Sequence, residues 1–206
     1  MYRKYNDPFV EGYLYHIFNR TINKELLFKS NRNFDFFLGR WKKYIGDLME
    51  VYAYCLLPTH FHFLAKVPES VSNPKRVTNT GSTNAPDINK KLEKQFELYF
   101  RSYAQAFNKE NNRTGSLFQK RFKRIQVDDE SYYTSLFYYI HLNPLHHDCT
   151  QKPLQWRYSS FAAIMSDKPT LVNREAFLSY FGSRQDFMNG LSDPQNFVEP
   201  KNYWIE

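Results

Sequence analysis

Residues 51–67 have the sequence VYAYCLLPTHFHFLAKV. Two runs of aliphatic and aromatic residues, typical of β-strands, flank the pair Pro58-Thr59. Because proline is confined to strand ends and turns, this pair predicts a turn or kink between two strands. Successive side chains of a strand point to opposite faces of a sheet, so His60 and His62 should share one face while Phe61 points to the other.

The segments on either side of this stretch predict the remaining elements. They are a strand at 13–22, a helix at 31–49 capped by Asn31 or Asn33, a helix at 87–109 capped by Asp87, a short strand near 123–127, and a helix at 129–142 that stops at Asn143-Pro144. The order is β-α-β-β-α-β followed by one more helix. It predicts an α+β fold of the ferredoxin-like, split βαβ kind, with an antiparallel sheet and helices on one face.

The sequence divides into one domain and an extension. Residues 1–148 hold the predicted domain, and within it 70–86 lack aromatic and most apolar residues, so we expect a flexible insertion there. Residues 149–206 include WRYSSFAAIM and EAFLSYFGSRQDFMNGL, which predict short helices with aromatic faces. We expect this helical extension to pack on the domain.

Composition limits the class of protein. Aromatic residues make up 18% of the 206 residues and the net charge is +7, which is typical of a globular chain with a polyanionic partner, either nucleic acid or an anionic membrane surface. No apolar run approaches the roughly 20 residues of a membrane span, and the N-terminus lacks the apolar core of a signal peptide. With two cysteines and no disulfide framework, we expect a soluble, cytoplasmic protein without a membrane partner.

Two local features could carry chemistry. Two imidazoles on one strand face, His60 and His62, can hold a divalent metal, but a catalytic site needs a further ligand. Tyr139 and Asn143 lie one helical turn apart, so an Asn143 carbonyl on the metal would hold Tyr139 beside it. Taken alone, each feature has an ordinary structural explanation: sheet histidines, a core tyrosine, and an asparagine that ends a helix.

Taken together, four motifs resemble one family. LLPTHFHFLAKV is similar to the His-hydrophobe-His strand of the HUH single-tyrosine transposases, especially the branch with the REP-associated tyrosine transposases. RTGSLFQKRFKR at 113–124 resembles the family's Gly-x-hydrophobe-Phe/Trp-Gln-x-Arg-Phe segment, YIHLNP its Tyr-Ile-x-x-Asn-Pro helix, and WRYSS at 156–160 its Trp-x-x-Ser-Ser segment. The order and spacing match over roughly residues 10–165, which makes chance agreement of the whole set improbable.

The resemblance implies an activity and a set of site residues. It implies a DNA transposase that cleaves and rejoins single-stranded, hairpin-associated DNA through a 5′-phosphotyrosine intermediate. His60 and His62 would be metal ligands, Asn143 the third ligand and Tyr139 the nucleophile. The implied metal is Mg²⁺ or Mn²⁺.

Rival residues exist for two of these roles. His141 competes with Asn143 as a ligand, although a position two residues from Tyr139 points away from that face of the helix. Tyr133 and Tyr138 compete as nucleophiles, but Tyr138 is rotated about 100° from Tyr139 on a helix. The register of the Ile-x-x-Asn-Pro motif favours Tyr139.

The basic stretch at 113–124 predicts DNA contacts. Its basic residues have no acidic residue among them and would neutralise phosphates; they are Arg113, Lys120, Arg121, Lys123 and Arg124. The interleaved Phe118 and Phe122 could stack on bases, but we expect them in the core.

Two other functions compete with the transposase. One is a non-catalytic, ferredoxin-like nucleic-acid-binding module, and the other a metal-dependent hydrolase that uses water as nucleophile. The sequence leaves open whether the active site is built within one chain or across a homodimer, and which DNA sequence is recognised.

Overall fold

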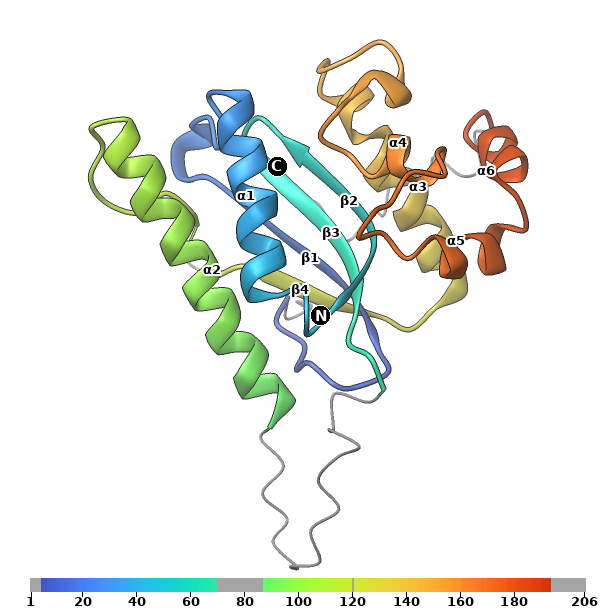
Figure 1. Ribbon diagram of the computed structural model, residues 1–206, viewed down its shortest axis with the longest axis horizontal. Coiled ribbons are helices and arrows are strands. Elements are labelled where there is room, and N and C mark those ends of the chain that lie inside the picture. The colour runs from blue at the N-terminus through green and yellow to red at the C-terminus, as the bar shows by residue number, and fades with distance from the viewer. Residues whose placement is uncertain (1–4, 70–86, 120, 194–206) are drawn as a thin grey trace, which may run out of the picture.

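A four-stranded antiparallel sheet forms the centre of the molecule (Figure 1). The computed structural model describes residues 5–193 except 70–86 and 120. The strands, in the spatial order β2-β3-β1-β4, are β1 (Leu14–Arg20), β2 (Glu50–Leu57), β3 (His60–Lys66) and β4 (Lys123–Val127). The outer strands are the second and last in sequence, which is the split βαβ arrangement. The predicted fold class is therefore confirmed.

The β2–β3 hairpin sets the register of the site. Its two-residue turn is Pro58-Thr59, and Leu57 pairs with His60 across it. On its other side β3 pairs with β1, so that His60 lies opposite Arg20 and His62 opposite Phe18. Because paired residues point to the same face of a sheet, the alternate residues of β1 share the face of the two histidines.

Two helices cover the opposite face of the sheet (Figure 1). They are α1 (Asn31–Tyr44) and α2 (Ile88–Glu110), with the short 3₁₀ helix η1 (Ile22–Lys24) before them. Trp41 of α1 stacks on Phe63 with 3.8 Å between ring centroids, and Phe37 packs against Phe61. Phe61 thus lies in the core, on the face away from the histidines, as the strand periodicity predicts.

The observed caps and ends of α1 and α2 match the predicted ones only in part. Asp87 caps α2 as predicted, because its carboxylate accepts from the backbone N–H of Asn89. The cap of α1 is Ser30 and not one of the two asparagines, since the Ser30 hydroxyl accepts from Asn33 N–H. Helix α1 ends at Tyr44, two residues before Gly46. At Gly46 a side chain would not fit, because its Cβ would lie 2.7 Å from the Lys42 carbonyl oxygen.

The histidine face of the sheet is covered by α3 (Glu130–His146) and the elements that follow it (Figure 1). These are η2 (Pro153–Gln155), α4 (Phe161–Ile164), α5 (Arg174–Phe181) and α6 (Arg184–Gly190). The prediction that α3 stops at Asn143-Pro144 is wrong. Pro144 has no N–H and so removes one hydrogen-bond donor from the last turn. The last turn is nevertheless held, because the Asn143 carbonyl accepts from His147 N–H and the Pro144 carbonyl accepts from Cys149 N–H. The helix therefore continues to His146. No helix among the described residues is long and apolar enough to cross a membrane.

The segment after α3 lies along the outer edge of the sheet, which is formed by β2. The indole N–H of Trp156 donates to the Leu56 carbonyl at 2.9 Å, and Leu56 N–H donates to the Tyr158 carbonyl. Ser160 N–H donates to the Tyr54 carbonyl. The WRYSS motif thus covers the outer edge of β2 at Tyr54 and Leu56, while Asn173 N–H donates to the Val51 carbonyl nearer the start of the strand.

The Ser160 hydroxyl links three elements, so its removal should destabilise the protein. Its oxygen lies 2.9 Å from Tyr54 N and 2.7 Å from His141 Nε2, and all three residues are mostly buried. Ser160→Ala leaves both partners unpaired and should lower the free energy of unfolding by about 1–3 kcal/mol. Ser135→Ala, which removes a hydroxyl that donates to the Ser131 carbonyl within α3, should change it by less than about 0.5 kcal/mol. Urea unfolding of both variants measures this, and equal effects would contradict the linking role.

Candidate active site

His60 and His62 lie side by side at the start of β3. Their side chains are largely buried, and their ring centroids are 5.3 Å apart. Nδ1 of His60 is 3.0 Å from the Thr59 hydroxyl, and Nδ1 of His62 is 2.9 Å from Nε2 of His16. Each ring therefore uses Nδ1 for a protein partner, which leaves Nε2 as the nitrogen that could bind a ligand.

The environment keeps these imidazoles neutral. Burial, with smaller contributions from His147 and Arg20, lowers the pKa of His60 to about 3. Burial also lowers the pKa of His62 well below its usual value, and neighbouring histidines add to the effect. A neutral imidazole has the lone pair that a metal ion requires. The charged and titratable neighbours of the pair that lower these pKa values are Arg20, His16 and His147, and none of the described carboxylates is among them.

Tyr139 lies over His62. The two rings meet edge to face with 5.4 Å between centroids, and Tyr139 is only partly buried. The rival tyrosines belong to the other side of α3. Tyr138 stacks on Phe187 and Tyr133 packs against Tyr180, and burial raises the pKa of both phenols.

Asn143 lies on the same side of α3 as Tyr139, one turn further along. It is fully buried, and neither atom of its amide has a hydrogen-bond partner among the residues that the structure describes. One more turn along, the His147 ring lies 4.7 Å from that of His60. Asn143 thus lies along α3 between Tyr139, which contacts His62, and His147, which contacts His60.

These side chains fit a divalent metal. His62 Nε2 is a buried nitrogen without a partner in the described part of the chain, as are both amide atoms of Asn143. Such unpaired buried atoms are unfavourable unless something binds them. Among the described residues, no group of three or more His, Cys, Asp or Glu side chains could hold a metal, so within this part of the chain a third ligand would be of another type, such as the Asn143 amide. The rival His141 has both ring nitrogens bonded, to Phe137 O and Ser160 Oγ.

Three residues near the pair do not stand out in the sequence. His16 contacts His62 from β1, Arg20 pairs with His60 in the sheet register, and His147 reaches His60 from the end of α3. The alternation of β1 places His16 and Arg20 on one face, but only the register with β3 shows which face that is. For His147, the signal is the spacing of four residues from Asn143 and eight from Tyr139.

Two of the predicted DNA-contacting arginines have other partners. Arg124 is 3% exposed, its Nη2 lies 2.6 Å from a Glu93 carboxylate oxygen, and its Nε donates to the Asp7 carbonyl. Side chains alternate along β4, so Lys123 and Ile125 point to the histidine face of the sheet and Arg124 points to the face covered by α2. Arg113 bonds to Glu25 at 2.7 Å and to carbonyls of the loop after α2. Both guanidinium groups make contacts within the fold, and their role as DNA contacts stays a prediction.

The other basic residues of the stretch are placed differently. Lys123 lies on the histidine face, with Nζ 5.9 Å from the Phe18 ring centroid, and burial and the nearby Arg20 lower its pKa. Arg121 is exposed, and Lys120 lies outside the described residues. The interleaved phenylalanines pack against the core, as expected: Phe118 contacts Phe61 and Phe100, and Phe122 contacts Phe96.

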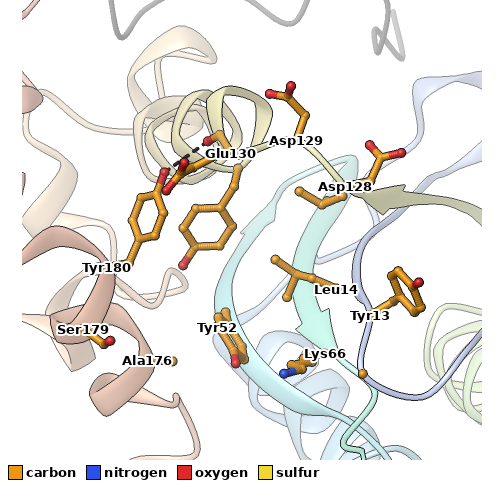
Figure 2. A pocket seen from close by; sticks show the side chains of 13 residues that line it. Tyr13, Leu14, Tyr52, Lys66, Asp128, Asp129, Glu130, Ala176, Ser179 and Tyr180 are labelled. Carbon is orange, nitrogen blue, oxygen red and sulfur yellow. Dashed lines mark hydrogen bonds between the residues drawn. The ribbon is translucent and has the colours of Figure 1, made fainter.

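A separate cavity of about 610 Å³ lies at the other end of the sheet, where α5 meets the start of α3. Figure 2 shows its lining, which includes Tyr52, Lys66, Tyr180 and the acidic run Asp128, Asp129 and Glu130. None of the predicted site residues that the structure describes lines it. The cavity is therefore separate from the histidine site, and its carboxylates would repel a nucleic acid.

Comparisons with known proteins find similarity to proteins of the kind that the motifs resemble. A "Putative REP-associated tyrosine transposase" of Haemophilus influenzae is 29% identical over 115 residues, which cover 54% of this chain and 58% of that protein. The chain thus matches little more than half of the relative's length. A solved structure of a REP-associated tyrosine transposase bound to a REP hairpin matches with a TM-score of 0.56 and 18% identity, over 81% of this chain and 88% of the other. No family model matches. The resemblance is confirmed, and the structural match shows a common fold.

Proposed function

We propose that this chain is a tyrosine transposase of the REP-associated kind, which cleaves and rejoins single-stranded DNA next to a hairpin. The strongest support is the position of Tyr139 over His62, with the Asn143 amide one turn away and without a hydrogen-bond partner among the described residues. The similarity to a transposase and to a hairpin-bound structure supports the same class of substrate.

Tyr139 is the proposed nucleophile. Its phenolic oxygen attacks the scissile phosphorus, the new O–P bond forms, and the bond from phosphorus to the 3′-oxygen breaks. The phenol loses its proton and the departing 3′-oxygen gains one, which gives a 5′-phosphotyrosine and a free 3′-OH. Because the phosphoester bond is exchanged and not hydrolysed, a second 3′-OH can reverse the step and join new ends.

His60, His62 and Asn143 are the proposed ligands of Mg²⁺ or Mn²⁺, through two Nε2 atoms and one amide oxygen. When bound, the metal would polarise a non-bridging oxygen of the phosphate. The chain itself supplies the basic surroundings, since Arg20 and His147 lie beside His60 and Lys123 lies beside Phe18. These groups would attract and orient the phosphate.

Covalent capture of DNA tests the proposal. The substrate is a set of hairpin oligonucleotides with randomised single-stranded flanks, labelled at the 3′ end so that the label stays with the 5′-phosphotyrosine. With Mn²⁺ we expect labelled protein that survives denaturation, and with EDTA none. Cleavage without labelled protein would indicate hydrolysis by water, and binding without cleavage a non-catalytic module; either would refute the proposed function.

The predicted DNA contacts are tested by the salt dependence of hairpin binding. Each neutralised phosphate contact contributes about 0.7–0.9 to the slope of log affinity against log salt. Lys123→Gln and Arg121→Gln should each reduce the slope by about that amount. Lys42→Gln, an exposed lysine on α1 across the sheet, should leave it unchanged. Equal slopes for all three variants, measured by fluorescence anisotropy, would place the DNA elsewhere.

A further inference from the structure

His16 is buried under α3 and forms a chain of contacts with two other side chains. Its Nε2 lies 2.9 Å from Nδ1 of His62, and its Nδ1 lies 3.4 Å from the hydroxyl of Tyr132. The His16 ring is fully buried and stacks on Phe18 with 4.4 Å between centroids. Tyr132 and Tyr139 are seven residues apart on one face of α3, so Tyr132 lies over His16 and Tyr139 over His62.

Two proton arrangements fit these contacts. In the first, His62 Nδ1–H donates to His16 Nε2, His16 Nδ1–H donates to the Tyr132 oxygen, and His62 Nε2 keeps its lone pair. In the second, the Tyr132 hydroxyl donates to His16 Nδ1, His16 Nε2–H donates to His62 Nδ1, and His62 Nε2 carries a hydrogen. Only the first can bind a metal, because a protonated ring nitrogen has no lone pair to give.

We propose that His16, backed by Tyr132, is a positioning residue that holds His62 in its metal-binding tautomer. This inference rests on the proposed metal site. The contact also fixes the plane of the His62 ring, since a hydrogen bond at Nδ1 determines where Nε2 points. Thr59 makes the equivalent contact to Nδ1 of His60. In both proposed ligands Nδ1 therefore contacts a neighbouring side chain and Nε2 points away from it.

The direct test reads the tautomers. In wild-type protein with ¹⁵N-labelled histidine and saturating Mg²⁺, the ring nitrogen shifts should show His16 and His62 both protonated at Nδ1 and not at Nε2. His16 protonated at Nε2 in the Mg²⁺-bound protein would overturn the proposal. This experiment needs no variant and so does not depend on whether a variant folds.

Mn²⁺ affinity tests the same role with substitutions. His16→Leu removes the acceptor for His62 Nδ1–H and should weaken Mn²⁺ binding about 10–100-fold, the usual effect of losing such a contact. His16→Gln offers an amide oxygen as acceptor and should stay within about threefold of wild type, whereas Tyr132→Phe should have a smaller effect than His16→Leu. Equal Mn²⁺ affinities of wild type and a folded His16→Leu variant, or no Mn²⁺ binding by wild type, would overturn the proposal.

Both measurements are made without DNA, so they separate the two claims. If His16→Leu weakens Mn²⁺ binding but wild type forms no covalent DNA adduct, the positioning role stands and the proposed function fails. If wild type forms the adduct and His16→Leu binds Mn²⁺ normally, the proposed function stands and the positioning role fails.

Discussion

Tyr139→Phe should abolish the covalent protein–DNA adduct, lowering its rate of formation by about 10³-fold or more. The substitution removes one oxygen atom, the proposed nucleophile, and keeps the ring that packs on His62. Because the side chain is only partly buried, we expect a change of less than about 1 kcal/mol in the free energy of unfolding. Gel analysis of labelled hairpin DNA after denaturation measures the adduct.

Tyr138→Phe is the matched control. Tyr138 is the adjacent residue of α3, but its ring stacks on Phe187 on the other side of the helix. This variant should form the adduct at the wild-type rate. Adduct formation by Tyr139→Phe, or its loss in Tyr138→Phe alone, would contradict the choice of nucleophile.

Asn143→Leu should separate activity from stability. The two side chains are similar in shape, and the Asn143 amide is fully buried without a partner in the described part of the chain. Its removal should raise the free energy of unfolding of the metal-free protein by about 1 kcal/mol, because an unpaired polar group no longer has to be buried. The loss of a ligand should lower the rate of adduct formation about 100-fold or more and weaken Mn²⁺ binding to a similar degree.

Asn33→Leu gives the opposite pattern and serves as the control. Asn33 is also buried, but its amide accepts from Lys29 N–H and donates to Glu110 at 2.7 Å. This variant should lose about 1–2 kcal/mol of stability and keep its Mn²⁺ affinity. If Asn143→Leu destabilises the metal-free protein as Asn33→Leu does, the Asn143 amide is structural and the ligand role is refuted.

The elements that could be predicted are those with a strong local pattern. The Pro58-Thr59 turn marks the start of a strand, and the alternation of side chains along that strand places His60 and His62 on one face regardless of tertiary packing. The end of α3 could not be predicted, because local preference stops a helix before Pro144, and the bonds that extend it depend on the chain after His146.

The less predictable part of the site comes from sheet register and burial. The sequence shows Lys123 and Arg124 as neighbours of equal charge, but alternation in β4 sends them to opposite faces, and only the packing of α2 reveals that Arg124 meets Glu93. His16 could not be assigned for a similar reason, since its contact with His62 requires the pairing of β1 with β3.

The most direct test of the central claim is to map the amino acid that becomes linked to DNA. The adduct is digested with nuclease and trypsin, and the peptide spanning residues 125–157 is fragmented in a mass spectrometer. This peptide contains Tyr132, Tyr133, Tyr138 and Tyr139, so one spectrum distinguishes all the candidates. We predict a nucleotide phosphate on Tyr139; its presence on another of these tyrosines, or cleaved DNA with no modified tyrosine, would contradict the account.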